Sequence, residues 1–553
     1  MASEGSAELA VTGAGAAPSA RASGATLVLL TLATGQFLMT LDSSVMNVSI
    51  ATVAEDVGTT VTGIQGAITA YTLVMAALMI TGAKIGAIIG RKRAFAIGCV
   101  VYGCGSLTTS LAPSLPVLLF GWSLLEGVGA ALILPAIVAL VASNFPTERR
   151  PAAYGLVAAA GAVAVAVGPL VGGFCTTYFS WRWVFAGEVV LVVAILILAR
   201  RIADAPSEQR PRLDVVGTVL SAAGLGMLVF GVLRSSEWGW IHPKPEGLSW
   251  AGLSPTIWLI LGGLFVIWLF ARWEARRQSR GEEPLVRPGF LRNRQLSGGL
   301  LMFFFQYLAQ AGLFFVVPLY LSVCLGLSAL ATGARLLPLS VTLLIAAIGI
   351  PRLLPDVSPR LIVRTGLLAL LAGTVVLLTG LDEDAGPDIV FVPMLLIGLG
   401  IGALASQLGS VTVSAVSDEE SPEVGGVQNT MTNLGASMGT ALAGSLMIAT
   451  VASSFVTNIQ QSSAIPNRVK SEAQVELAGG VPFISDADLE EALDEARVSP
   501  RASDAALDAY RSARIDGLRS ALAILAALVI GALFFAQRVP TTQPGATAAE
   551  REE

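Results

Sequence analysis

Long apolar stretches separated by short polar loops recur along the whole chain of 553 residues. A helix crosses a bilayer with about 20 apolar residues at ~1.5 Å rise per residue, and these stretches reach that length. We therefore expect an all-α polytopic membrane protein with about fourteen transmembrane helices. They are predicted at residues 27–48, 65–86, 94–112, 116–142, 152–175, 183–200, 213–233, 256–272, 297–325, 329–350, 360–380, 389–412, 425–455 and 516–536.

The composition supports this class. Hydrophobic residues make up 54% of the chain and charged residues 13%, with a mean hydropathy of +0.72, whereas soluble domains carry roughly 25% charged residues. The four cysteines lie in apolar stretches without metal-ligand spacing, and the only histidine is His242. No Gly-Lys-Ser/Thr phosphate loop occurs, so neither an enzyme nor ATP-driven transport is indicated, and we expect no cofactor, metal or nucleic acid.

Basic residues mark one side of the membrane. They concentrate in alternate loops, at residues 84–93, 149–150, 200–212, 272–294 and 352–364. The opposite short loops hold only Arg182, Arg234 and Lys244. The positive-inside rule then places both termini in the cytoplasm.

Several segments interrupt the apolar rhythm. Residues 1–25, rich in Ala, Gly and Ser, are predicted to be a disordered cytoplasmic tail, and 538–553 a second tail. Residues 457–515 have the composition of a soluble outer loop. Within this loop Ser485 precedes two acids as a helix N-cap would, which predicts a surface helix over Asp486–Arg497.

One carboxylate interrupts the first apolar stretch, within Leu41-Asp42-Ser43-Ser44-Val45-Met46-Asn47. An acid at the centre of a membrane helix costs about 2.5–3.5 kcal/mol on insertion scales, so it indicates a functional site. Gly35, Met39, Asp42 and Met46 follow helical spacing and share one face. We interpret this face, with the adjoining Asn47, as the wall of a passage. The alternative is an acid that serves only packing.

Further motifs lie in the same half of the chain. They are Gly90-Arg91-Lys92-Arg93 between the second and third helices, Gly161 with Gly168-Pro169-Leu170-Val171-Gly172-Gly173 in the fifth, and Ser180-Trp181-Arg182-Trp183-Val184-Phe185 before the sixth. Together with the first-helix motif, they resemble the major facilitator superfamily in its fourteen-helix drug:proton antiporter group, over nearly the whole chain.

The resemblance implies an architecture and a way of working. Two six-helix bundles are expected at 26–201 and 295–537, with a two-helix insertion and its linkers at 202–294 between them. Such bundles rock about a midplane site that opens to either side in turn. The glycines and Pro169 of the fifth helix, and the Gly90–Arg93 loop, would be conformational motifs. Close helix packing is the alternative role of the glycines.

The sequence departs from the family pattern at particular positions. The signature loop normally has an acid followed by an arginine, where this chain has Ala87 and Ile88. In the fourth helix, Ser123 and Glu126 replace the usual arginine and glutamine, and Glu188 replaces the usual asparagine of the sixth. The N-terminal bundle thereby loses a cation and gains two acids.

These acids are the candidate coupling site. Counting residues along each helix puts Asp42 and Glu126 at similar depths, roughly 10 to 15 Å in, so we expect them to be neighbours. Glu188 is expected to be shallower and peripheral. Two carboxylates away from water cannot both stay ionised, so the pair would hold a proton that a cationic substrate displaces. The alternative for Glu126 and Glu188 is a purely structural role.

The C-terminal bundle has no acid in the middle of a predicted span. Its candidate cavity residues are amides, at Gln306, Gln310, Gln407, Asn429 and Asn433. Neighbouring phenylalanines would give this bundle an apolar, aromatic wall that suits lipophilic and often cationic molecules.

We therefore expect a monomeric, proton-coupled exporter of drugs or metabolites in a bacterial inner membrane, acting on small molecules within the lipid bilayer. Two alternatives remain open at this point. One is a lipid or fatty-acyl exporter of the same fold. The other is a membrane sensor or assembly subunit that does not transport.

Overall fold

The computed structural model describes residues 18–145, 149–202, 204, 213–244, 248–287, 289–416, 421–462, 465, 470, 482–496 and 498–542. Within these ranges the regular structure is helical and contains no strand, which confirms the all-α fold class. The remaining residues, including 1–17 and 543–553 of the two predicted tails, lie outside the described part.

The first half of the chain forms α1 (Pro18–Asp56), α2 (Val61–Ile89), α3 (Arg91–Ser110), α4 (Leu115–Leu118), the π-helical η1 (Leu119–Glu126), α5 (Gly127–Asn144), α6 (Arg150–Tyr178) and α7 (Arg182–Ala199). The insertion forms α8 (Val215–Trp238), α9 (Pro255–Ser279) and α10 (Gly289–Arg292). The second half forms α11 (Arg294–Leu319), η3 (Tyr320–Cys324), α12 (Ala329–Leu353), α13 (Pro359–Gly380), η4 (Pro387–Val390), α14 (Phe391–Val413), α15 (Ser421–Gln461), α17 (Asp486–Glu495), α18 (Pro500–Phe535) and η6 (Ala536–Arg538).

Thirteen helices of the described residues are long and apolar enough to span a membrane. The predicted span at 94–112 falls on α3, which is not among these thirteen helices. α3 begins with three basic residues and ends in Ser and Thr, and these residues lower its mean hydropathy. Phe95 and Tyr102 of α3 are nevertheless fully buried. The number fourteen therefore stays a prediction.

Several helices extend beyond the predicted spans, and α18 begins at Pro500, inside the segment predicted as the outer loop at 457–515. α1 begins at Pro18, inside the segment predicted as a tail, because proline suits the first turn of a helix and Ala and Ser permit its continuation. In the predicted outer loop, Ser485 caps α17 in a reciprocal capping box with Asp488, as the sequence indicates. The predicted end of this helix, Arg497, lies outside the described residues.

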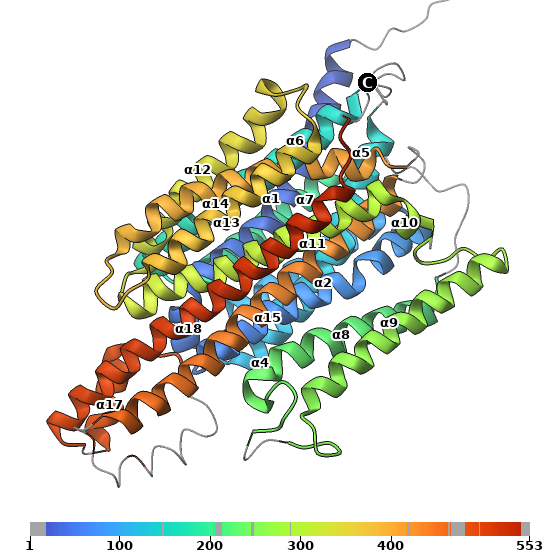
Figure 1. The fold of residues 1–553 in the computed structure, drawn as a ribbon. Coiled ribbons are helices and arrows are strands. Elements are labelled where there is room, and N and C mark those ends of the chain that lie inside the picture. Colours follow the sequence, from blue (N-terminus) through green and yellow to red (C-terminus); the bar gives the residue numbers. More distant parts are fainter. Residues whose placement is uncertain are drawn as a thin grey trace, which may run out of the picture.

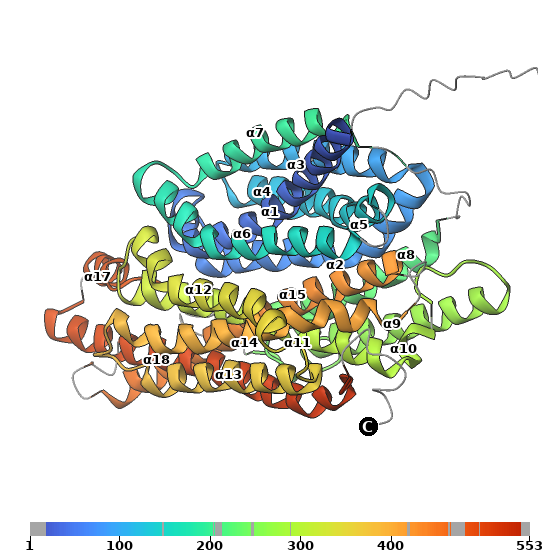
Figure 2. The same cartoon turned by 90° about the horizontal axis from the view of Figure 1, so that it is seen from above.

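The helices form two bundles, and the yellow-to-red helices of the second half lie in front of the blue-to-cyan helices of the first half in Figure 1. Figure 2 shows α1 and α3–α7 on one side and α11–α14 with α18 on the other, with α2 and α15 where the two meet. α8 packs against both α2 and α15, through Val229 with Ala76 and Leu434. α9 covers α8 from outside and presents exposed side chains such as Leu264 and Phe265.

Polar contacts join the two bundles at two seams. Between α2 and α15, Gln65 Nε2 donates to the Thr440 carbonyl at 3.2 Å, and Ser437 Oγ donates to the Thr69 carbonyl at 3.0 Å. Between α6 and α12, the Leu330 amide donates to Thr177 Oγ1 at 3.0 Å. These seams bring α2 and α6 of one bundle against α15 and α12 of the other.

The predicted topology can be tested at two exposed positions. We expect Ala492→Cys, on α17, to be labelled by an impermeant thiol reagent in spheroplasts of cells that produce a variant without the four native cysteines. Ser279→Cys, at the end of α9, should be labelled only after the membrane is opened. The reverse pattern would contradict the predicted orientation.

Candidate functional site: a buried carboxylate trio

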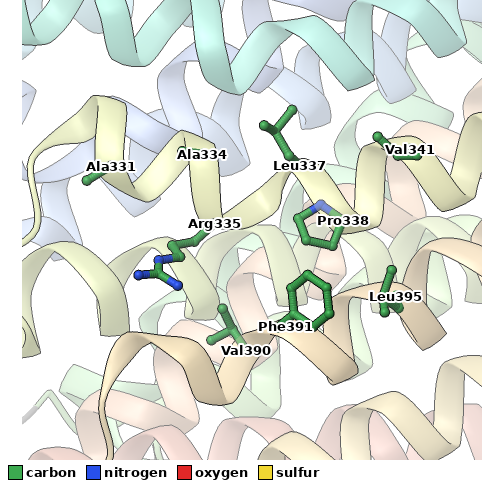
Figure 3. A pocket seen from close by; sticks show the side chains of 9 residues that line it. All are labelled: Ala331, Ala334, Arg335, Leu337, Pro338, Val341, Val390, Phe391 and Leu395. Atoms are coloured by element: carbon green, nitrogen blue, oxygen red, sulfur yellow. The ribbon is translucent and has the colours of Figure 1, made fainter.

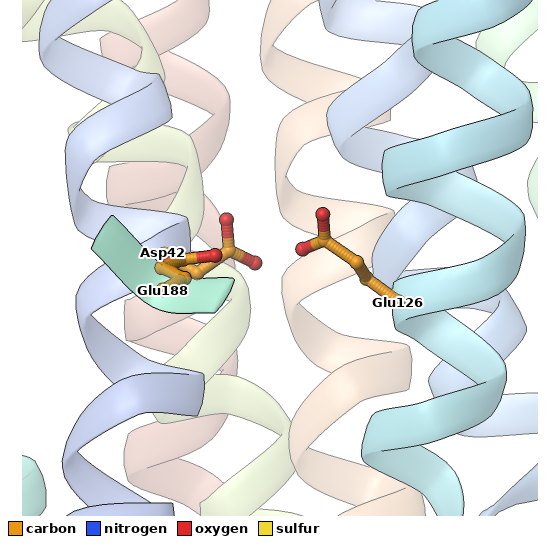
Figure 4. Close-up of side chains that lie close together, drawn as sticks. All are labelled: Asp42, Glu126 and Glu188. Atoms are coloured by element: carbon orange, nitrogen blue, oxygen red, sulfur yellow. The ribbon is translucent and has the colours of Figure 1, made fainter. Parts of the chain in front are cut away.

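Three acidic side chains meet inside the N-terminal bundle (Figure 4). Asp42 of α1, Glu126 of η1 and Glu188 of α7 each offer a carboxylate oxygen within 4.8 Å of the others. At most 1% of each residue is exposed. The predicted neighbourhood of Asp42 and Glu126 is present, but the prediction of a shallow, peripheral Glu188 is wrong. We call these residues the carboxylate trio.

Asp42 accepts hydrogen bonds from one aromatic side chain. Trp122 Nε1 lies 2.8 Å from Asp42 Oδ1 and 3.0 Å from Oδ2. The indole stacks on the Tyr71 ring, with centroids 5.1 Å apart and planes inclined by 13°. A ring held by stacking cannot easily turn its N–H away, so it fixes the carboxylate.

Glu188 is held by α3 and positioned by the end of α1. Glu188 Oε2 accepts from Tyr102 Oη at 3.2 Å and from Ser106 Oγ at 3.0 Å. At the start of α7, Trp181 Nε1 donates to Asp56 at the end of α1, at 2.9 Å. Glu188 follows Trp181 by seven positions, which is about two helical turns, so this anchor turns the acid toward the trio.

Glu126 ends a π-helical segment that lies very close to α3. A Cβ atom on Gly105 would lie 2.7 Å from the Gly121 carbonyl oxygen and 2.6 Å from Glu126 Cγ. Only glycine allows this approach, which also brings Thr109 Oγ1 within 3.1 Å of Glu126 Oε1. π-Helical turns inside helices frequently occur at functional sites.

Within the described part of the chain, no Lys or Arg forms an ion pair with any of the three carboxylates. Glu126 Oε2 and Glu188 Oε1 are buried without a hydrogen-bond partner. Since like charges this close and away from water cannot all persist, the trio must hold protons or a cation. Carboxylate oxygens of this kind suit a proton or a hard cation.

Sequence reasoning missed the hydrogen-bond donors of the trio, which are Trp122, Tyr102, Ser106 and Thr109. One signal was available, because Trp122 precedes Glu126 by four residues and therefore shares its helix face. The donors on α3 carry no comparable signal, since the sequence does not show which face of α3 meets α7.

The other predicted residues of this bundle pack against neighbouring helices or form hydrogen bonds to backbone carbonyls. Met39 and Met46 are buried, and Gly35 packs against α3 and α5. Asn47 donates to a carbonyl of its own helix at 2.9 Å, and Ser123 to a carbonyl of α2 at 2.9 Å. The face that contains Asp42 thus points into the bundle, and a passage along it stays a prediction.

The predicted amides of the C-terminal bundle lie on α11, α14 and α15. Gln306 and Gln310 are buried on α11, and the Oε1 atom of each has no partner. Gln407 is buried on α14. On α15, Asn433 Nδ2 donates to the Asn429 carbonyl at 2.9 Å, within one helix. Among the five predicted amides, the buried oxygen atoms without a hydrogen-bond partner are therefore those of Gln306 and Gln310.

An acid from elsewhere in the chain, Asp204, contacts the loop between α2 and α3. Gly90 adopts a φ of +101°, and a Cβ there would lie 2.8 Å from a carboxylate oxygen of Asp204. The same carboxylate accepts from the Lys92 amide at 3.3 Å, and Arg91 Nη1 donates to a carbonyl of α5 at 3.2 Å. Ala87 stands where the family usually has an acid in this loop, and Asp204 brings a carboxylate to the loop from elsewhere in the chain. Arg93 is exposed.

The glycine motif of α6 faces two helices at once. Added Cβ atoms on Gly161, Gly168 and Gly172 would meet side chains or backbone of α1. An added Cβ on Gly173 would lie 2.5 Å from a carbonyl oxygen of α12, and the Pro169 carbonyl lies against a glycine of α12. The motif lets α6 lie close to its own bundle and to the partner bundle.

An apolar groove lies elsewhere, between α12 and α14 (Figure 3). Its volume is about 670 Å³, and its lining includes Leu337, Pro338, Val341 and Phe391. More than half of Val341 and Phe391 is exposed. The groove therefore opens toward the outside of the C-terminal bundle, away from the carboxylate trio.

The fold and the trio together define a polytopic membrane transporter built from two helical bundles. The profile of the Major Facilitator Superfamily matches residues 32–241 and 212–440, and the chain belongs to this family. It is a transporter of small molecules and not an enzyme.

Similar proteins are named for drug resistance, transport or efflux. The chain is 34% identical to the puromycin resistance protein pur8 of Streptomyces alboniger, over 75% of this chain and 80% of that protein. It is 29% identical to a probable actinorhodin transporter of Streptomyces coelicolor, over 91% and 84%. It is 26% identical to the multidrug efflux pump LfrA of Mycolicibacterium smegmatis, over 92% and 94%.

Solved structures share the fold. A bacterial homolog of the human lysosomal transporter Spinster, inward-facing and unoccupied, matches with a TM-score of 0.57 and 14% identity, over 95% of this chain and 99% of that one. The human organic anion transporter MFSD10 matches with a TM-score of 0.52 and 13% identity, over 94% and 100%.

The Trp122–Asp42 contact can be tested by stability. We expect Trp122→Phe to lower the thermal unfolding midpoint of the purified protein in detergent. The ring can still stack on Tyr71, but the buried carboxylate loses its indole donor, which costs about 1–3 kcal/mol. Trp183→Phe, at an exposed position of α7, is the matched control and should leave the midpoint unchanged. Equal midpoints for the two variants would contradict the assigned contact.

Proposed function

We propose that this transporter is a proton-coupled antiporter that exports lipophilic, often cationic drugs or metabolites across a bacterial plasma membrane, with both termini in the cytoplasm. The observation that carries the proposal is the carboxylate trio, which is buried and forms no ion pair with a basic side chain of the described residues. The names of the relatives, which include puromycin resistance and multidrug efflux, favour drugs as the substrates.

Protons would be held by the trio in this mechanism. Asp42, Glu126 and Glu188 lie so close that a negative charge on one acid opposes ionisation of the others. The positive charge of a bound substrate offsets this repulsion and therefore favours the loss of one proton. A cationic substrate that approaches Trp122 and Tyr71 would therefore drive deprotonation of the acids behind them. Export of substrate and entry of protons become linked through this shared charge.

The motion would take place at the two seams between the bundles. Gly173 and Pro169 of α6 contact α12, so a rocking movement of the bundles must change this contact. Gln306 and Gln310, whose Oε1 atoms have no partner, belong to the opposite bundle and would contact the polar parts of a substrate. The substrate would then lie between an acidic and an apolar bundle.

A lipid or fatty-acyl exporter is the second candidate. The apolar groove between α12 and α14 favours it, because a molecule with acyl chains could leave the bilayer there. Competition of dye export by a fatty-acyl ester would support this candidate, and saturable dye export that such esters leave unchanged would favour the first.

The central role of Asp42 can be tested in inverted vesicles. We expect Asp42→Asn to abolish dye uptake driven by a proton gradient, at normal expression, because the amide keeps the size of the side chain but cannot exchange a proton. Glu55→Gln changes an exposed acid of the same helix and should retain uptake. Normal uptake by Asp42→Asn would show that the residue is only structural.

Glu126 can be tested through the charge of the substrate. Glu126→Gln restores the amide that the family usually has and removes one of three negative charges. A doubly charged dye loses about twice the Coulomb attraction that a singly charged dye loses. We expect export of the divalent dye to fall roughly tenfold more than that of the monovalent dye. An unchanged ratio of the two dyes would mean that Glu126 is a neutral packing residue.

A further inference from the structure

A second polar site lies far from the trio, at one end of the C-terminal bundle. A pocket of about 470 Å³ is lined by Arg294, Gln295, Arg360, Arg364, Gln537, Arg538 and Pro540. We call it the basic pocket. Its arginines come from the start of α11, the start of α13 and the end of η6, so three elements that are distant in sequence contribute to it.

Backbone and side-chain contacts build this pocket. Arg360 Nε donates to the Val539 carbonyl at 2.7 Å, and the Arg360 amide donates to the Pro540 carbonyl at 3.2 Å. An added Cβ on Gly298 would lie 2.7 Å from Arg538 Cβ, so α11 also packs closely on this segment. The end of the last helix is therefore fixed between α11 and α13, with arginines on both sides.

The charge of the basic pocket is uncompensated. Of the acids in the described ranges, none lines the pocket or pairs with its four arginines. Arg294, Arg364 and Arg538 are exposed. Guanidinium groups bind phosphate in a fork geometry, and several of them around one pocket favour a ligand with a phosphate group.

The surroundings of the pocket are apolar. Leu361 and Leu368 lie three residues before and four residues after Arg364 on α13, so they share its face, and both are about half exposed. On α18, Phe534 is 70% exposed one turn before Arg538. These exposed apolar side chains lie beside the pocket on α13 and α18.

We propose that the basic pocket binds the phosphate headgroup of an anionic phospholipid, whose acyl chains lie along the exposed apolar side chains of α13 and α18. A basic site at the membrane boundary is the arrangement that recognises such headgroups. The apolar side chains beside it distinguish a lipid from free phosphate. Since the pocket shares no residue with the carboxylate trio, this inference does not depend on the substrate proposed above.

The test measures lipid binding by the full-length protein, purified in detergent, with native mass spectrometry. Phosphatidylglycerol is titrated first alone and then against phosphatidylcholine or inorganic phosphate. Each arginine near a membrane surface contributes about fivefold to the affinity for anionic lipid. We therefore expect the double variant Arg294→Gln/Arg364→Gln to bind phosphatidylglycerol about thirtyfold more weakly.

The controls separate charge, fold and occupant. Arg352→Gln changes an arginine of the last turn of α12 that does not line the pocket, and it should bind phosphatidylglycerol as the unchanged protein does. Arg294→Lys/Arg364→Lys keeps the charge but removes the guanidinium fork, so its binding of phosphatidylglycerol should fall between that of the unchanged protein and that of the glutamine variant.

Several outcomes would overturn the proposal. Equal affinity of the double variant and Arg352→Gln would do so, and so would equal binding of phosphatidylcholine. Displacement of the lipid by inorganic phosphate at similar concentration would assign the pocket to a free anion. Lipid binding that requires removal of residues 543–553, which include three glutamates, would assign it to the chain's own tail.

Discussion

Burial of three carboxylates that no basic side chain of the described residues pairs with is the constraint on which the N-terminal bundle depends. Such a group is stable only if protons or a bound cation offset its charge and if donors satisfy its oxygens. Trp122 donates a hydrogen bond to Asp42, and side chains of α3 donate hydrogen bonds to the two glutamates. The packing of α1, α3, η1 and α7 is organised around this requirement, which couples the charge state of the site to the arrangement of four helices.

The same glycine-mediated packing connects the site to the rest of the molecule. α1, which carries Asp42, lies directly against the glycines of α6, and α6 in turn lies against α12 of the other bundle. A change of charge at Asp42 that shifts α1 would therefore reach the seam between the bundles through a single helix. α8 bridges the other seam, since it contacts both α2 and α15, so the insertion would follow the same movement.

The sequence predicted the helices well because a membrane span is a length and a composition, and both are local properties. It also predicted that Asp42 and Glu126 are neighbours. It placed Glu188 wrongly, because counting residues gives depth along a helix but not the direction of its face, and the Asp56–Trp181 contact that sets this direction joins distant residues. For the same reason, Asp204 as the acid of the loop at Gly90 could not be predicted from the loop itself.

Release of protons on binding of substrate tests the account most directly. The purified protein is mixed with a cationic dye in weakly buffered detergent solution that contains a pH indicator. The account predicts that the unchanged protein acidifies the solution as the dye binds, and that Asp42→Asn binds dye with little or no acidification. Dye binding without proton release by the unchanged protein, or equal release by both proteins, would contradict the role assigned to the carboxylate trio.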